Sequence, residues 1–404
     1  MIPSKILSIA LVTVLSAFQV VHAGPLFEKQ TIVAPGTHGH VHASCIVECP
    51  NGDLRAVWYE NGTHLPAPYY DQRKDKSDDV RIGGARKPRG AVAWEQPFVM
   101  ADSFGVSDNN PCMVIDKSRR LWLIYPTLLG VPQNAWGSAI VRYSVSANYE
   151  QPGRPIWLKQ DILVPHPEGL EAVLRQSFAG LEKLSDARAE RARAFQARAE
   201  QRLRDPLAVR LGWMPRAHPL VRADGTLVLP LSNENFNVAV MALTRDGGET
   251  WTYSKPVPES GLTQPTLVEF SDGQITAFFR NGDRRHRIKR SDSKDGGLTW
   301  SEVTVTDLPH PGAGIEAVLL HNGHLAMVYN DKESGPRDRL AVSISTDRGR
   351  TWTWTRHIED TRGGRFDYPS VIQAKDGTLH VTYTDGTRTI RHVHFNEDWV
   401  LEKT

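Results

Sequence analysis

Short apolar stretches occur in pairs along this chain, and each pair flanks a turn of more polar residues. The pattern is repeated six times, as "SCIVECPNGDLRAVWY", "PCMVIDKSRRLWLIYP", "AHPLVRADGTLVLPLS", "PTLVEFSDGQITAFFR", "IEAVLLHNGHLAMVYN" and "PSVIQAKDGTLHVTYT". The copies align without gaps on one residue after the turn, which is Leu54, Leu121, Leu227, Ile275, Leu325 or Leu379. Apolar runs joined by Asp-Gly or Asn-Gly turns are typical of β-hairpins. The pattern therefore predicts six hairpins with a common register.

A second repeat follows three of these hairpins. "TRDGGETW" ends at Trp251, "SKDGGLTW" at Trp300 and "STDRGRTW" at Trp352, and Trp94 and Trp157 mark weaker copies in the first two repeats. The aspartate can accept backbone N–H bonds within a tight turn, and the tryptophan offers a large face for packing between sheets. We interpret the motif as a structural turn rather than a calcium or ligand loop.

Two hairpins per repeat give four strands, which is the content of one propeller blade. The sequence thus predicts an all-β fold, a six-bladed β-propeller over residues 24–404. The stretch "KQTIVAPG" near residue 30 is expected to be an outer strand that closes the ring against the sixth blade.

Residues 167–205 interrupt the repeat. Leu170, Leu174 and Phe178 recur at helical spacing, and a run rich in Ala, Arg and Glu follows them. We expect two helices inserted between blades two and three. A solvated flap resting on the propeller is the preferred interpretation, with a lid or a dimer contact as the alternatives.

The N-terminus has the composition of an export signal. Lys5 precedes a mostly apolar run over residues 6–21, and "VHA" ends at Ala23 as a small-residue cleavage site. We expect a signal peptide over residues 1–23 and a periplasmic or extracellular protein, with a membrane anchor as the alternative. Basic and acidic residues nearly balance, 48 against 46, so the charge does not predict nucleic acid or a membrane surface as a partner.

The cysteines and histidines give only weak signals. Of the three cysteines, Cys45 and Cys112 occupy equivalent positions in adjacent repeats, so a disulfide between them is a hypothesis for an exported protein. His38, His40 and His42 alternate, which we interpret as a surface strand rather than a metal or sugar site. No phosphate loop, nucleophile elbow or paired metal-ligand motif occurs, so no cofactor or metal is expected.

The register also predicts which side chains meet at the propeller axis, where the innermost strands of all blades begin. Because strand side chains alternate, two sets separated by two residues face the axis. The upper ring, nearer the start of the strands, contains Ala43, Asn110, Arg216, Gln264, Gly314 and Tyr368. The lower ring contains Cys45, Cys112, His218, Thr266, Glu316 and Ser370. With Arg280, Asn330 and Arg339 from neighbouring strands, these polar groups predict one convergent site in which arginines hold a carboxylate.

The three Asp-containing phrases and the six registered hairpins, which span almost the whole chain after residue 23, resemble the Asp-boxes and six-bladed propeller of the sialidase (neuraminidase) superfamily. The resemblance implies a substrate carboxylate held by three arginines, a tyrosine nucleophile activated by a glutamate, and an aspartate as acid/base. Tyr368 in "FDYPS", Arg280 in "AFFRNG" and Arg339 in "RDRLAVS" match that pattern. The first-blade loop supplies the aspartate from Asp71, Asp78 and Asp79, and we favour Asp79.

Two positions depart from the family pattern. His42 in "HVHAS" stands where the first arginine belongs, and Gln264 stands where the glutamate belongs, 16 residues before Arg280. A glutamine cannot take a proton from a tyrosine. His42 is therefore a candidate for binding or proton transfer, and Glu316 is a candidate for the missing carboxylate.

The resemblance implies an exported exo-glycoside hydrolase that acts on a terminal acidic sugar of a glycan through an altered active site. In this hypothesis Arg280, Arg339 and Arg216 bind the carboxylate, and His218, Gln264 and Asn330 complete the substrate site. Two alternatives stay open. One is a uronic-acid polysaccharide lyase in which His42 or His218 acts with Tyr368, and the other is a carbohydrate-binding propeller without catalysis.

Overall fold

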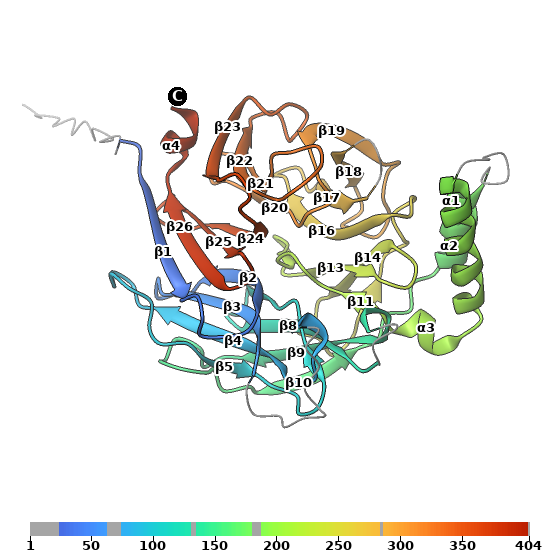
Figure 1. Ribbon diagram of the computed structural model, residues 1–404, viewed down its shortest axis with the longest axis horizontal. Coiled ribbons are helices and arrows are strands. Elements are labelled where there is room, and N and C mark those ends of the chain that lie inside the picture. The colour runs from blue at the N-terminus through green and yellow to red at the C-terminus, as the bar shows by residue number, and fades with distance from the viewer. Residues whose placement is uncertain (1–23, 63–73, 131–134, 180–186, 283–285, 403–404) are drawn as a thin grey trace, which may run out of the picture.

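Six antiparallel sheets surround a common axis in the computed structural model, which describes residues 24–62, 74–130, 135–179, 187–282 and 286–402 (Figure 1). Each sheet corresponds to one of the six sequence repeats, and its innermost strand lies beside the axis. The predicted all-β, six-bladed propeller is confirmed.

The blades follow one another in chain order. Blade one contains β2 (Val41–Glu48), β3 (Leu54–Asn61), β4 (Val80–Lys87) and β5 (Phe98–Ala101). Blade two contains β6 (Ser107–Asp108), β7 (Cys112–Ile115), β8 (Leu121–Leu128), β9 (Ala139–Ser146) and β10 (Lys159–Leu163). Blade three contains β11 (Trp213–Met214), β12 (Leu220–Val221), β13 (Leu227–Asn233), β14 (Val238–Thr244) and β15 (Thr252–Tyr253).

The second half of the ring repeats the same arrangement. Blade four contains β16 (Leu262–Glu269), β17 (Ile275–Asn281), β18 (Arg287–Ser293) and β19 (Thr304–Pro309). Blade five contains β20 (Glu316–Leu319), β21 (Leu325–Asn330), β22 (Arg339–Ser345) and β23 (Trp354–Asp360). Blade six contains β24 (Phe366–Gln373), β25 (Leu379–Asp385), β26 (Thr389–Phe395) and β1 (Phe27–Val33).

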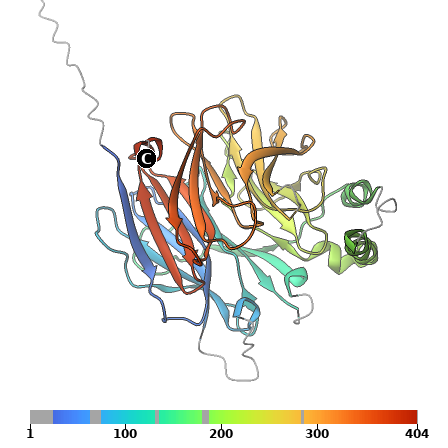
Figure 2. The same ribbon diagram turned by 45° about the horizontal axis from the view of Figure 1, so that its top comes forward.

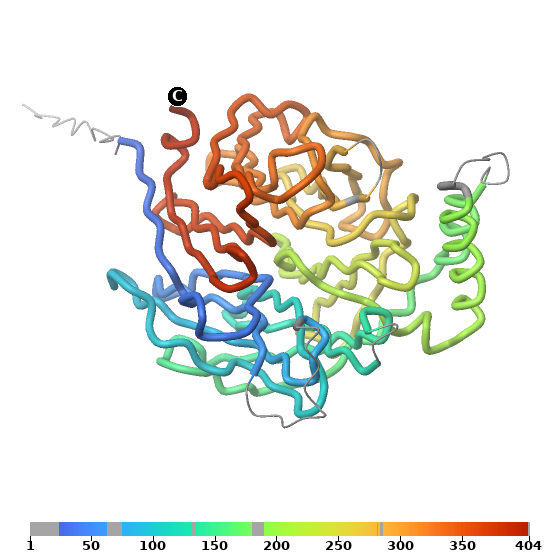
Figure 3. Tube along the Cα trace, in the orientation of Figure 1, coloured from blue at the N-terminus to red at the C-terminus, as the bar shows by residue number. Residues whose placement is uncertain are grey.

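The ring is closed by strands from both ends of the chain. β1 pairs antiparallel with β26, with Phe27 opposite Phe395 and Thr31 opposite Arg391. Figure 3 shows this N-terminal segment, in blue, running alongside the C-terminal strands, in red. The closing strand predicted from "KQTIVAPG" is confirmed. Because the sixth sheet takes strands from both termini, the ring cannot open without breaking this ladder.

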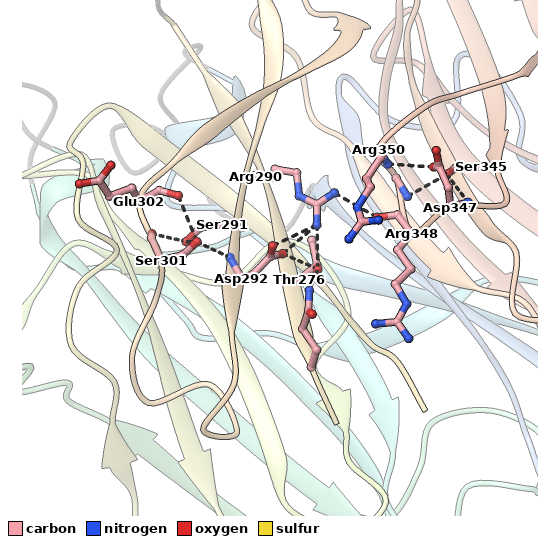
Figure 4. Close-up of polar contacts among 12 residues, drawn as sticks. Thr276, Arg290, Ser291, Asp292, Ser301, Glu302, Ser345, Asp347, Arg348 and Arg350 are labelled. Carbon is pink, nitrogen blue, oxygen red and sulfur yellow. Dashed lines mark hydrogen bonds and ion pairs between the residues drawn. The ribbon is translucent and has the colours of Figure 1, made fainter. Parts of the chain in front are cut away.

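The repeated Asp phrases form turns at the outer part of the blades, as predicted. In blade five, Asp347 accepts hydrogen bonds from the backbone N–H groups of Arg350 at 3.0 Å and Thr351 at 2.8 Å (Figure 4). Partial burial alone would raise the pKa of Asp347, but the hydrogen bonds from Thr351, Ser345 and Arg350 lower it to about 2. The carboxylate is therefore ionised at neutral pH and holds its own turn.

These turns also join neighbouring blades. Gly349, at φ +76°, lies so close to blade four that an added Cβ would stand 2.9 Å from Phe278, and Trp352 packs on the same ring at 6.1 Å. Arg290 of blade four donates to the backbone carbonyl of Arg348 at 3.0 Å, a contact visible in Figure 4. The Asp phrase thus stabilises the contact between two sheets.

The helical insertion stands outside the ring of blades (Figures 1 and 2). It contains α1 (Leu170–Phe178) and α2 (Ala187–Leu203), the two expected helices, and the short helix α3 (Pro206–Arg210) after them. α4 (Glu397–Leu401) follows the last strand. Across the described ranges, no helix has both the length and the apolar character needed to cross a membrane.

The hypothesis of a Cys45–Cys112 disulfide is wrong, because both cysteines are free and buried. The Cys45 sulfur instead accepts a hydrogen bond from the backbone N–H of Met113 at 3.2 Å and lies 3.3 Å from Nε2 of His218. Cys45 and Cys112 occupy equivalent positions in the same ring, but the Cys45 sulfur contacts Met113 and His218 instead of forming a disulfide.

Candidate active site

A cavity of about 810 Å³ lies over the upper ring at one end of the axis. Its walls come from strands and loops of all six blades. Its charged and aromatic lining residues include His42, Tyr59, Asp75, Glu234, Glu259, Arg280, Lys289, Arg337, Arg365 and Tyr368. Of the residues predicted for the site, His42, Asn110, Gln264, Arg280 and Tyr368 line this cavity.

A shared backbone distortion turns the upper ring toward the cavity. Ala43, Asn110, Gln264 and Tyr368 all have positive φ, between 34° and 53°, at equivalent places in four blades. The strand pairing shifts register at three of these places, as expected for a β-bulge. A non-glycine residue in this region costs roughly 1–3 kcal/mol, and such strain is retained mainly where a side chain has to be aimed.

Tyr368 lies at the centre of the site. Its Oη accepts hydrogen bonds from Nη1 of Arg280 at 3.0 Å and Nε2 of Gln264 at 3.3 Å. Its ring packs directly on Gly314, where an added Cβ would stand 2.7 Å from Cδ1. Burial alone would raise the pKa of Tyr368, but the charge of Arg280 and the hydrogen bond from Gln264 lower it overall. Both contacts come from hydrogen-bond donors, so they make the phenol of Tyr368 more acidic than an ordinary tyrosine.

Arg216 supports Tyr368 from the other side. The Arg216 guanidinium lies 4.8 Å from the centre of the tyrosine ring and donates to the backbone carbonyl of Pro369 at 2.8 Å. Only 1% of Arg216 is exposed, and it does not line the cavity. The predicted role of Arg216 as a direct carboxylate ligand therefore does not fit its position, whereas a cation–π contact that orients Tyr368 does.

Arg337 occupies the place that the sequence assigned to Arg339. Arg337 lines the cavity and donates from Nη1 to Oδ1 of Asp367 at 2.6 Å, while Arg365 donates to Oδ2 of the same carboxylate at 2.6 Å. Arg339 begins β22, pairs there with Asp360 of the outer strand, and keeps 42% of its side chain exposed away from the cavity. Arg339, predicted as a carboxylate ligand, is therefore not brought to the cavity, whereas Arg337 from the loop before β22 is.

The first-blade loop brings a different aspartate to the cavity from the one predicted. Asp79 is 1% exposed, accepts a hydrogen bond from Asn61 at 3.2 Å and does not line the cavity. Asp71 lies outside the described residues. Asp75, in the short 3₁₀ helix Lys74–Lys76, lines the cavity instead, and burial raises its pKa. It belongs to the same acidic stretch, "DQRKDKSDD", which was the only signal in the sequence.

Glu316 and His218 form a closed pair in the lower ring and do not reach the cavity. Oε1 of Glu316 accepts from Nδ1 of His218 at 2.9 Å, and Oε2 accepts from the backbone N–H of Val371 at 2.9 Å. Nε2 of His218 lies 2.7 Å from the carbonyl of Ile46, so both ring nitrogens face acceptors and the imidazolium is favoured.

The charges of this pair are stabilised by each other. Burial alone would lower the pKa of His218, but the neighbouring Cys45 sulfur and the Glu316 carboxylate hold it well above its usual value. Burial alone would raise the pKa of Glu316, but His218 lowers it. Glu316, predicted as the base for Tyr368, and His218, predicted as a substrate ligand, thus lie outside the cavity lining, where they link blades three and five.

Asn330 is fully buried and does not line the cavity. Its side-chain amide donates to the carbonyls of Phe366 at 3.0 Å and Arg337 at 3.4 Å. It thereby holds the loop that carries Arg337 against the start of β24, which carries Tyr368. Asn330 is a positioning residue rather than the substrate ligand that the sequence predicted.

His42 lies beside Tyr368, with the two ring centres 4.6 Å apart and the rings nearly perpendicular. His40 and His42 are each 6% exposed, so the expected surface strand is wrong: they belong to the innermost strand region of blade one. Burial lowers the pKa of His42 well below its usual value despite the attraction of Asp367. Within the part of the chain that the structure describes, Nδ1 of His42 has no hydrogen-bond partner.

Sequence reasoning missed the part of the wall formed by a loop of blade three and by the loop that leads into blade four. Glu234 and Asn237 come from the loop between β13 and β14, and Glu259 comes from the loop before β16, where it pairs with Lys289. Burial raises the pKa of Glu234. The sequences of these loops are not part of the repeat. The one feature of the sequence that could have predicted them as site residues is that they connect strands at the same end of the propeller as Arg280.

The cavity thus combines three kinds of chemistry. Arg280 and Arg337 provide planar donors suited to a carboxylate, Tyr368 provides a phenol with a lowered pKa, and Asp75 provides a carboxyl group with a raised pKa. Together these groups could bind an acidic ligand and transfer a proton to it.

Comparisons with known proteins give matches over part of the chain. A model for the BNR repeat-like domain matches residues 191–381. The sialidase of Micromonospora viridifaciens is 27% identical over 171 residues, which are 40% of this chain and 26% of that protein. The sialidase of Paraclostridium sordellii is 28% identical over 198 residues, 43% of this chain and 48% of that protein. These alignments thus span half or less of the curated relatives.

A solved structure extends the likeness to nearly the whole chain. The Hadza microbial sialidase Hz136 superposes with a TM-score of 0.66 at 15% identity, covering 92% of this chain and 69% of that one. At this identity the likeness establishes the fold alone.

Proposed function

The chain is a sialidase-like six-bladed β-propeller with BNR repeats, and from this premise we propose that it is a glycoside hydrolase that removes a terminal acidic sugar from a glycan. The observation that carries the proposal is the group formed by Arg280, Gln264 and Tyr368 beside Arg337 in one cavity. Relatives of this chain carry the name sialidase, and an acidic sugar is the ligand that such a group of arginines suits.

The shape of the cavity supports action at a chain end. Below Tyr368 the axis is filled by the lower ring, so the cavity has a floor. Five residues of that ring are each at most 2% exposed: Cys45, Cys112, Thr266, Glu316 and Ser370. A pocket with a floor accepts the end of a glycan rather than its middle.

Export, suggested by residues 1–23, is part of the proposal; those residues lie outside the described part of the chain.

In this proposal each cavity residue has one task. Arg280 and Arg337 bind the substrate carboxylate, and Tyr368 stabilises the positive charge that develops at the anomeric carbon. Asp75 donates a proton to the departing oxygen, for which a carboxyl group with a raised pKa is suited. Gln264 and His42 distinguish this site from the family pattern, so its sugar need not be the one that the relatives' names imply.

One observation favours a second candidate, a lyase that acts on uronic acids. His42 is a neutral, buried imidazole beside Tyr368, with Nδ1 lacking a hydrogen-bond partner among the described residues. Such a pair could remove the proton next to a carboxylate that the arginines neutralise.

Product analysis separates these activities. The purified protein is incubated with sialosides, uronides and acidic polysaccharides, and the products are followed by mass spectrometry and ultraviolet absorbance. The proposal predicts a free acidic monosaccharide at the mass of hydrolysis and no new absorbance. An unsaturated product with new absorbance would identify the lyase, and binding without turnover would contradict both activities.

A further inference from the structure

The seam between blade six and blade one differs from other seams of the ring in its polar contacts. In later blades the tryptophan of each Asp phrase packs between two sheets, and within the described part of the chain its indole Nε1 has no hydrogen-bond partner, as for Trp251, Trp300 and Trp352. Trp94, in the loop between β4 and β5 of blade one, instead donates from Nε1 to Nδ1 of His392 in β26 at 3.2 Å. A hydrogen bond therefore joins the two blades at the seam where β1 closes the ring.

The indole donor fixes the protonation of the histidines behind it. An indole N–H can only donate, so Nδ1 of His392 carries no proton and the proton of its ring is on Nε2. That Nε2 lies 2.9 Å from Nδ1 of His380 in β25, which must therefore accept, so the proton of His380 is on its own Nε2. Nε2 of His380 lies 3.1 Å from Oγ1 of Thr378, and this hydroxyl donates to Oδ1 of Asp376 at 2.7 Å. The side chains thus form one chain of hydrogen bonds in which both histidines are neutral.

We propose that this chain of hydrogen bonds is an acid-sensitive latch that holds blade six against blade one. A proton added to His392 would turn its Nδ1 into a donor that faces the N–H of Trp94. A proton added to His380 would likewise set its Nδ1–H against the Nε2–H of His392. In either case two donors face each other and a hydrogen bond is lost, so the latch opens. This inference does not depend on the proposed hydrolysis and adds a response to pH to the fold.

The surroundings of the latch oppose a proton on it. Burial, aided by the stacked ring of His394 at 5.3 Å between ring centres, lowers the pKa of His380 to about 4. Lys87 of β4 acts in the same direction, and Asp376 acts against it. Burial also holds the pKa of His392 well below its usual value, and the neighbouring histidines and Lys87 add to this effect. The closed latch therefore excludes protons that the histidines of an open seam would take up.

The third histidine of this stack has a different partner and is not part of the latch. Nδ1 of His394 lies 3.6 Å from Oε2 of Glu28 in β1. Burial lowers the pKa of His394, and Glu28 opposes this change. Lys87 and Asp376 add smaller effects of opposite sign. A proton on His394 would therefore attract the closing strand β1, whereas a proton inside the latch breaks its hydrogen bonds.

The direction of the pH effect follows from the lowered pKa values. Well above pH 6.5, the ordinary pKa of histidine, the rings are neutral whether the seam is closed or open, and the latch has its full strength. As the pH falls from there toward about 4, the open seam takes up protons that the closed latch excludes. Opening therefore becomes more favourable by up to about tenfold for each pH unit and each histidine. Below about pH 4, His380 gains its proton even in the closed state.

Hydrogen–deuterium exchange of the full chain measures opening of the seam. Exchange is followed by mass spectrometry at about pH 7.5 and about pH 5, with the intrinsic effect of pH on exchange divided out. The latch predicts that protection of β1, β26 and the loop that carries Trp94 falls at least about tenfold on acidification. Protection of β18 and β22, at the seam of blades four and five, should fall less than about twofold. Equal changes at the two seams would overturn the proposal.

Two tryptophan variants test the hydrogen bond itself at about pH 7.5. Trp94→Phe keeps an aromatic ring but removes the N–H, which leaves Nδ1 of His392 buried without its donor. Trp352→Phe is the matched control, because it makes the same change where Nε1 has no hydrogen-bond partner among the described residues. Trp94→Phe should lower protection of its seam about tenfold more than Trp352→Phe lowers protection of the seam between blades four and five. Equal losses in the two variants contradict the latch.

A histidine variant tests the response to pH. His392→Gln keeps an acceptor and a donor in the chain but does not titrate, so the loss of seam protection on acidification should be at least about tenfold smaller than in the wild type. His357→Gln, at an exposed histidine paired with Asp331 in blade five, is the control and should keep the wild-type response. A wild-type response in His392→Gln overturns the proposal. Thermal melting shows whether each variant is folded, and if one is not, exchange in the wild-type protein decides alone.

Discussion

The upper and lower rings are built from the same innermost strands, two residues apart, yet they have opposite chemical environments. In the upper ring, Tyr368 and Gln264 face a cavity of about 810 Å³ and have bulged backbones. In the lower ring, His218 and Glu316 face each other across the axis and satisfy one another. His218 lines a smaller pocket of about 400 Å³, together with residues that follow the lower ring.

The difference shows that a polar side chain at a propeller axis is not by itself a functional residue. A buried charge that finds a partner becomes part of the scaffold, as in the lower ring. A polar group that is held in a strained backbone and left facing open space is available for chemistry, as in the upper ring. The lower ring supports the upper one by closing the axis beneath Tyr368.

The largest effect is expected from breaking the lower ring. Glu316→Gln leaves the buried His218 imidazolium without its counter-ion, so the free energy of unfolding should fall by about 3–5 kcal/mol. Chemical denaturation measures this change. The matched control Glu249→Gln removes an exposed pair with Lys159 and should cost less than about 1 kcal/mol. Equal stability of Glu316→Gln and wild type would show that the pair does not hold the axis together.

The upper ring should give the reverse result, a loss of activity with little loss of stability. Tyr368→Phe removes the oxygen that Arg280 and Gln264 contact and should lower kcat by about 10²–10³-fold. Steady-state kinetics on the identified glycan, with thermal melting beside it, measures both quantities. Activity within a few-fold of wild type would remove Tyr368 from the mechanism.

A smaller effect distinguishes two neighbouring arginines. Arg337→Lys keeps the charge but loses the planar pair of donors, so KM should rise about tenfold. Arg339→Lys, two residues away and outside the cavity, should change KM by less than about twofold. Michaelis–Menten curves for the two variants decide between them. A larger rise in KM for Arg339→Lys would restore the original sequence-based assignment.

The repeats made the fold and the membership of both rings predictable from the sequence. Six hairpins in one register fix which residues face the axis, and Tyr368, Gln264 and Arg280 were found in this way. The Asp phrases were equally readable, because each turn is held by contacts within a few residues, such as those of Asp347.

The rest of the site depended on information that the repeats do not contain. Three cavity residues lie in loops of unequal length, namely Asp75, Glu234 and Arg337. These loops have no repeating pattern from which the position of a side chain could be predicted. The pairing of Glu316 with His218 spans the axis between residues 98 positions apart, so register placed both in one ring but could not show that they neutralise each other. The hydrogen bond from Arg202 of α2 to the backbone carbonyl of Asn235 is a tertiary contact of the same kind.

The most direct measurement is a crystal structure of Tyr368→Phe with the acidic glycan identified by the product analysis. The proposed function predicts that the sugar carboxylate lies within hydrogen-bonding distance of Arg280 and Arg337, with the glycosidic oxygen on the side of Asp75. A sugar bound in the pocket below the lower ring, or with its carboxylate turned away from both arginines, would contradict it.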